Sequence, residues 1–135
     1  MKSRMTLILA SLVALIASIT VVTYLCVGQQ GYQTISVSDA QTMIESSPNL
    51  LIVDVRTPQE YAQGHLNGAI NIPLSDLPLR IVSLDPNRPI LVYCRTGHRS
   101  AQASAILVRA GFTRVYNLQG GITAWVNAGY PIVTP

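Results

Sequence analysis

Apolar residues follow three patterns along this 135-residue chain. The segment 5–27 is a continuous run of 23 residues without a charge. The segments 50–53 and 90–93 are short continuous apolar runs, which are typical of central strands in a parallel sheet because such strands are buried on both faces. The segment 100–109 is rich in alanine and is followed by Gly111, a pattern that predicts a helix with a glycine after its last turn.

Capping and turn residues divide the rest of the chain into alternating strands and helices. Thr57 followed by Glu60 is a capping-box pattern that predicts the start of a helix, and Ser38 followed by Gln41 predicts another. Five strands are expected, near 34–37, 50–53, 69–72, 90–93 and 115–117. Strands that alternate with helices predict an α/β fold with a five-stranded parallel sheet, helices on both of its faces, and functional sites at the carboxyl ends of the strands.

The uncharged run at the amino end follows Lys2 and Arg4, and it is long enough to cross a bilayer, which takes roughly 20 apolar residues. A cleavable signal peptide has an apolar core of only about 7–15 residues, so we expect an N-terminal transmembrane helix that is retained. The predicted organisation is a membrane anchor at 1–28, a short linker at 29–33 and one domain at 34–135.

The positive flank of this run also predicts an orientation. Lysine and arginine next to an apolar run resist translocation, which predicts a single-pass protein of the cell membrane with a cytoplasmic amino end and an extracytoplasmic, periplasmic domain. The alternative is cleavage of the run as a signal and secretion to the periplasm.

The charge of the domain argues against one class of partner, and its cysteine content argues against a disulfide. Lys2 and Arg4 are two of nine basic residues, and the seven others face six carboxylates, so the domain has no strong basic excess and nucleic acid is not an expected partner. Cys26 lies in the apolar run and Cys94 lies in the domain, so no disulfide within the chain is expected. Cys94 is therefore predicted to be a free thiol.

The segment from Cys94 to Ser100 contains the candidate reactive and substrate-binding residues. Cys94 follows the strand at 90–93 and precedes the helix at 100–109, so its thiol is expected at the carboxyl end of a strand and next to the positive end of a helix. The partial positive charge at that helix end is expected to lower the pKa of the thiol, which predicts a reactive nucleophile and an anion-binding site. The alternative for a lone cysteine is a small buried core residue. The loop residues expected to bind substrate are Arg95, Thr96, Gly97, His98, Arg99 and Ser100.

Several other polar and aromatic residues are expected close to this loop in a structural role. Carboxylates that pair with arginine usually fix loops, and large aromatic side chains usually pack. The residues interpreted in this way are Asp54, Arg56, Glu60, Tyr61, His65 and Trp125.

Three separated motifs, within about Thr34 to Pro131, resemble the rhodanese (sulfurtransferase) domain. The first is 54–61 (DVRTPQEY) followed by 64–73 (GHLNGAINIP), the second is the loop 94–100 (CRTGHRS), and the third is 118–125 (LQGGITAW). The resemblance implies the rhodanese-like fold and a catalytic cysteine that takes a sulfane sulfur from a donor such as thiosulfate. The sulfur is held as a transient persulfide and passed to cyanide or another thiol, with no resident cofactor and no metal.

Two alternatives to sulfur transfer remain. A phosphatase branch of the same fold places arginine six positions after the cysteine, where this chain has Ser100, and Arg99 comes one residue too early. The other alternative is a non-catalytic, membrane-tethered module that binds a partner or senses persulfides, because a fold alone does not determine an activity.

Overall fold

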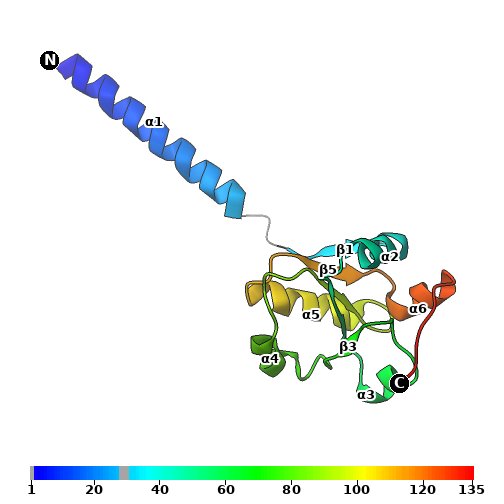
Figure 1. The fold of residues 1–135 in the computed structure, drawn as a ribbon. Helices are drawn as coiled ribbons and strands as arrows, with labels where there is room; N and C mark the ends of the chain where they lie inside the picture. The colour runs from blue at the N-terminus through cyan, green and yellow to red at the C-terminus, as the bar shows by residue number, and fades with distance from the viewer. Residues whose placement is uncertain (1, 28–30) are drawn as a thin grey trace. The chain divides into compact units, whose positions relative to one another are not determined.

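The computed structural model describes residues 2–27 and 31–135, and the chain divides into two units, Met1–Gln30 and Gly31–Pro135. The first unit contains helix α1 (Lys2–Val27), drawn in blue in Figure 1. The side chains of residues 18–27, which belong to the predicted transmembrane run, and residues 28–30, which include part of the predicted linker, lie outside the described residues. Within the part that is described, no helix is long and apolar enough to cross a membrane.

The second unit is built on a five-stranded parallel sheet, as the sequence predicts. In spatial order its strands are β1 (Gln33–Ile35), β5 (Val115–Leu118), β4 (Ile90–Tyr93), β2 (Leu51–Asp54) and β3 (Ile70–Asn71). The central strand β4 is buried along its whole length, which explains its continuous apolar sequence. Because all pairings are parallel, the carboxyl ends of β2, β4 and β5 lie at the same edge of the sheet.

Helices alternate with these strands (Figure 1). They are α2 (Val37–Ser46), α3 (Pro58–Ala62), α4 (Leu77–Arg80) with the 3₁₀ turn Ile81–Ser83, α5 (His98–Arg109) and α6 (Gly121–Asn127). The capping box predicted at Thr57 and Glu60 is confirmed, since each side chain receives the other's backbone N–H. The start predicted at Ser38 is wrong, because Ser36 is the residue with extended backbone whose hydroxyl accepts the N–H of Asp39.

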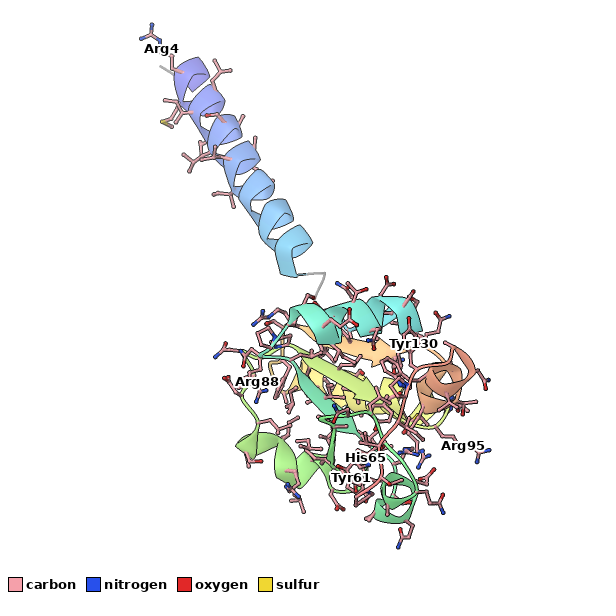
Figure 2. All side chains as sticks on the ribbon, turned by 45° about the vertical axis from the view of Figure 1, so that its right-hand side comes forward. Arg4, Tyr61, His65, Arg88, Arg95 and Tyr130 are labelled. Atoms are coloured by element: carbon pink, nitrogen blue, oxygen red, sulfur yellow. The ribbon has the colours of Figure 1, made fainter. Side chains whose placement is uncertain are left out.

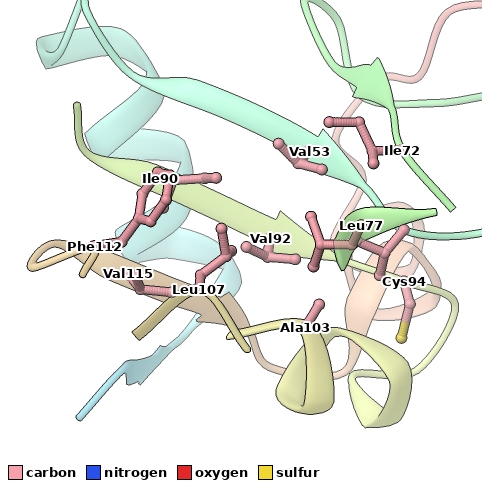
Figure 3. Close-up of a cluster of buried hydrophobic side chains, with 11 residues drawn as sticks. Val53, Ile72, Leu77, Ile90, Val92, Cys94, Ala103, Leu107, Phe112 and Val115 are labelled. Atoms are coloured by element: carbon pink, nitrogen blue, oxygen red, sulfur yellow. The ribbon is translucent and has the colours of Figure 1, made fainter. Parts of the chain in front are cut away.

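Side chains alternate between the two faces of the sheet and form two separate cores. Ile90, Val92 and Cys94 point to the face covered by α4 and α5, where they pack with Ala103 and Leu107 (Figure 3). The intervening Leu91 and Tyr93 pack on the other face, with Ala40 of α2 and with Ile122 and Trp125 of α6. Cys94 therefore belongs to the core between the sheet and α5, and it lies at the edge of the sheet where the chain leaves β4 for α5.

Candidate active site

The thiol of Cys94 is enclosed by the loop that joins β4 to α5. The residue is only 1% exposed, and its Sγ accepts hydrogen bonds from the backbone N–H of Gly97 at 3.1 Å and from the hydroxyl of Ser100 at 3.4 Å. Gly97 has a left-handed φ of 99°, which a side chain rarely adopts, so glycine lets the loop turn its N–H back onto the sulfur. The chain thus folds into a cradle of donors around one sulfur atom.

These donors control the protonation of Cys94. Burial raises the pKa of the thiol, but hydrogen bonds from the Ser100 hydroxyl and from the backbone N–H groups of Ser100, Thr96 and Gly97 outweigh burial and lower the pKa below its ordinary value. Donors that point at sulfur stabilise a thiolate over a thiol. Cys94 is therefore both a core residue and a sulfur prepared to ionise, which combines the two interpretations that the sequence allowed.

The start of α6 supports the loop from the side of the neighbouring strand. The N–H groups of Ile122 and Thr123 donate to the carbonyl oxygens of Cys94 and Arg95 at 2.9 and 3.1 Å. Gly121, with φ of 60°, lies directly against the backbone of Cys94 and Arg95, and a Cβ there would lie only 2.6 Å from the carbonyl carbon of Arg95. Gly121 is thus required because helix and loop backbones touch at this point, whereas a Cβ at Gly120, with φ of 72°, would meet the side chain of Ala124.

Arg99 points to α3 and forms a two-bonded ion pair with Glu60. Its two terminal nitrogens donate to the two carboxylate oxygens, each at 2.8 Å. This pair lowers the pKa of Glu60 to about 2, and the same hydrogen bonds raise the pKa of Arg99. The sequence predicts Arg99 as a substrate-binding residue and Glu60 only as a structural one. It does not predict that these two residues, 39 positions apart, form an ion pair. The one local signal for Glu60 is its place in the capping box, because that box fixes the carboxylate.

Asp54 and Arg56 form a second, buried ion pair beside the loop. The guanidinium binds both carboxylate oxygens of Asp54, with the shortest contact at 2.6 Å, and also donates to the carbonyl of Gly64 at 2.6 Å. Burial by itself lowers the pKa of Arg56, but the hydrogen bond and charge of Asp54 outweigh it and raise that pKa. The pair therefore ties the carboxyl end of β2 to the turn after α3.

His65 and Trp125 both hold the carboxyl-terminal segment. The ring of His65 stacks on Tyr61 with centroids 3.7 Å apart, and its backbone exchanges two hydrogen bonds with Val133. The indole N–H of Trp125 donates to the carbonyl of Pro131 at 2.9 Å. The side-chain contacts found here for both residues join them to backbone and to aromatic rings of the domain.

The remaining loop residues form the outer rim of the site. Arg95, Thr96 and His98 are exposed, and Figure 2 shows Arg95 projecting away from the domain. Two open pockets of about 320 Å³ each flank the loop. One is lined in part by Arg56, Glu60, Ile122 and Thr123, and the other by Thr34, Thr96, Gly97, His98, Asn117, Gln119 and Gly120.

This chain is similar to known proteins in sequence and in fold. The profile of the family described as Rhodanese-like domain matches residues 36–128. A sulfurtransferase of Allochromatium vinosum is 44% identical over 92 residues, which cover 68% of this chain and 86% of the relative. A thiosulfate sulfurtransferase of Stutzerimonas stutzeri is 41% identical over 75 residues, covering 56% of this chain and 69% of the relative.

Solved structures give the same result. The crystal structure of a rhodanese-related protein from Thermoplasma volcanium superposes with a TM-score of 0.70 at 34% sequence identity. The match covers 77% of this chain and all of the other chain. The fold of the domain is therefore shared with this rhodanese-related protein.

Proposed function

The chain belongs to the rhodanese-like domain family and is a sulfurtransferase of the rhodanese type, and we propose that it moves a sulfane sulfur from a donor such as thiosulfate to a thiophilic acceptor through a persulfide on Cys94. The observation that carries this proposal is the Cys94 sulfur itself, which is buried, accepts hydrogen bonds from the loop and has a lowered pKa. A sulfur in this state attacks another sulfur as a thiolate.

In the first step the Cys94 thiolate attacks the outer sulfur of thiosulfate. A new S–S bond forms to Cys94, the S–S bond of thiosulfate breaks, and its electron pair leaves on sulfite. We expect the Gly97 and Ser100 donors, which bind Sγ in the free protein, to stabilise the negative charge that moves to the outer sulfur of the persulfide.

In the second step the acceptor attacks that outer sulfur. Cyanide takes the sulfur as thiocyanate, whereas a thiolate takes it as a new persulfide, and in both cases the S–S bond breaks toward Cys94 and restores its thiolate. The electrons balance within each step, so the cycle requires no oxidant and no further cofactor.

Arg99 is proposed to contribute positive charge near the departing sulfite. Its terminal nitrogens each donate to Glu60, and the charge and hydrogen bonding of Cys94 also raise the pKa of Arg99, which indicates that the guanidinium is close to the reacting sulfur. Arg95 lies on the exposed rim and is proposed to attract anionic donors rather than to hold the reacting atoms.

The test measures the intact mass of the protein and the amount of sulfur that it transfers. The full chain is incubated with thiosulfate and its intact mass is measured, and cyanide is then added and thiocyanate is quantified. We expect a gain of one sulfur atom on the chain that cyanide removes, and no gain in Cys94→Ser, because a neutral hydroxyl neither ionises nor forms a persulfide. Retained transfer in Cys94→Ser refutes the mechanism. No transfer by the wild-type chain to any acceptor supports the non-catalytic module instead.

We also propose that residues 1–28 anchor the protein in the cell membrane with the domain on the periplasmic side. The support is the sequence, in which 23 uncharged residues follow Lys2 and Arg4 and the next charged residue is Asp39. The protein is then expected to remain in the membrane pellet after high-salt and carbonate washes, because insertion is hydrophobic and is not screened by salt. Mature protein that begins near Gln29 in the soluble periplasmic fraction contradicts the anchor and indicates a cleaved signal.

A further inference from the structure

Two arginines beside the Cys94 loop, Arg56 and Arg99, are each paired with a carboxylate. Arg56 binds Asp54 in a buried pair, and Arg99 donates to both oxygens of Glu60 at 2.8 Å. The side chains of Arg99 and Glu60 are 34% and 28% exposed, so solvent reaches this second pair. The positive charge that Arg99 presents to an anion in solution is therefore largely cancelled by its partner.

Glu60 is held in place by the residue that starts α3. Its Oε2 accepts the backbone N–H of Thr57 at 3.0 Å and the hydroxyl of Thr57 at 3.1 Å, and the same carboxylate binds Arg99. The ion pair with Arg99 lowers the pKa of Glu60 to about 2. Glu60 is therefore ionised throughout the pH range in which a protein thiol reacts, and the pair has no net charge in that range.

Arg99 lies in the first turn of α5, next to a residue that binds the reacting sulfur. Its neighbour Ser100 donates its hydroxyl to Sγ of Cys94 at 3.4 Å. The hydrogen bonds to Glu60 raise the pKa of Arg99 most, and the charge and hydrogen bonding of Cys94 raise it further. Arg99 thus interacts with both Glu60 and the sulfur, so a change in charge at Glu60 affects an anion that approaches Cys94.

Helix capping does not require a negative charge at position 60. Glutamine also serves as the third residue of a capping box, because its side-chain oxygen accepts the same N–H. The charge of Glu60 acts instead on Arg99. Resting on the proposed sulfur transfer, we propose that Glu60 is a specificity-determining residue: by neutralising Arg99, it limits the preference of the Cys94 site for doubly charged sulfur donors over singly charged ones.

Thiosulfate and methanethiosulfonate are a matched pair of donors for the test. Both carry an outer sulfur on an oxidised sulfur atom, but thiosulfate has two negative charges and methanethiosulfonate has one. With both donors the Cys94 thiolate attacks the outer sulfur and forms a new S–S bond, while the old S–S bond breaks and its electron pair leaves on sulfite or on methanesulfinate. With cyanide as the acceptor, the ratio of kcat/KM for thiosulfate to that for methanethiosulfonate reports the charge of the site.

Glu60→Gln keeps the capping box and removes one negative charge. The donor ratio is expected to rise roughly threefold, the effect of one unit charge on another about 6 Å away in water. Arg99→Gln removes a positive charge and is expected to lower the ratio by a similar factor. Glu45→Gln is the matched control, because Glu45 is exposed on α2 without an arginine partner among the described residues, and it is expected to leave the ratio within about 1.5-fold.

The double variant Glu60→Gln/Arg99→Gln separates charge from structure. Its two substitutions remove one charge of each sign, so the net charge of the pair is zero, as in the wild type. The donor ratio is therefore expected to return to within about twofold of the wild-type value. A pair that only holds α3 and α5 together predicts no such recovery, since both partners are then missing.

Alkylation of Cys94 tests the same charge without sulfur transfer. Iodoacetate is an anion and iodoacetamide is neutral, and both react with the thiolate, so a change in the thiolate fraction cancels in the ratio of their rates. Measured at pH 7 on the peptide that contains Cys94, this ratio is expected to rise roughly threefold in Glu60→Gln and to fall by a similar factor in Arg99→Gln. The result does not depend on turnover, so a chain that transfers no sulfur refutes the proposed function and still tests the role of Glu60.

Two outcomes overturn the proposal. An unchanged ratio in Glu60→Gln, in either measurement, means that the carboxylate serves the fold and not the site. A ratio that falls in Glu60→Gln means that the carboxylate holds Arg99 in a productive position and does not limit its charge.

Discussion

Replacing Glu60 by glutamine tests how much the Glu60–Arg99 ion pair stabilises the fold. Glutamine still serves as the third residue of a capping box, so the α3 start is kept and only the charge is removed. In the folded protein the pKa of Glu60 is about 2, compared with an ordinary 4.5. A group with a lowered folded pKa contributes stability above its unfolded pKa and loses that contribution as the pH falls through its folded pKa.

The magnitude follows from the two pKa values and from exposure. The difference between them sets an upper limit of about 3 kcal/mol at 1.36 kcal/mol for each pKa unit. The side chains of Arg99 and Glu60 are 34% and 28% exposed, so solvent screening reduces the expected contribution to about 1 kcal/mol. The wild-type protein is therefore expected to be more stable than Glu60→Gln by this amount at pH 7, and the difference is expected to shrink between about pH 4.5 and pH 2.

The assay is urea unfolding followed by circular dichroism at pH 7, 5, 4 and 3. Glu45→Gln is the matched control, since Glu45 is exposed on α2 and has no arginine partner among the described residues. A stability difference for Glu60→Gln that is the same at pH 7 and pH 3 refutes the reasoning, because it shows that the cost does not come from the charge. A difference that grows at low pH refutes it as well.

Three further predictions address the site directly. Gly121→Ala is expected to abolish most sulfur transfer and to destabilise the fold by more than Gly68→Ala, because both glycines have positive φ but only Gly121 touches the loop backbone; equal effects in unfolding experiments contradict the close approach. Asp54→Asn leaves the buried Arg56 without a counter-charge, which is expected to lower the free energy of unfolding by about 3–5 kcal/mol, and a cost within about 0.5 kcal/mol of that for the exposed Asp85→Asn contradicts this. The rate of iodoacetamide modification of Cys94 is expected to reach half its maximum below the ordinary thiol pKa of about 8.5, and at a higher pH in Ser100→Ala, since the hydroxyl of Ser100 stabilises the thiolate; an unchanged or lower midpoint in Ser100→Ala contradicts that role.

The sequence alone determined the elements and the order of the chemistry along the chain. The apolar runs of β2 and β4, the capping box at Thr57 and the glycine pair at 120–121 act through backbone within a few residues, so their effects can be predicted locally. The same holds for the position of Cys94 between a strand and a helix. The misplaced start of α2 shows the limit of local reasoning, because Ser36 and Ser38 both have capping chemistry and only the backbone conformation at Ser36 decides between them.

The tertiary structure decided which side chains meet. Arg99 pairs with Glu60 because strand β4 lies beside β2, which brings the helices that follow the two strands to one edge of the sheet. Asn117 reaches Thr34 across 83 positions because β1 pairs with β5, and both residues line the pocket that also includes Thr96 and His98. Contacts of this kind depend on strand order and register, which result from the packing of both cores at once and leave no periodic signal in the sequence.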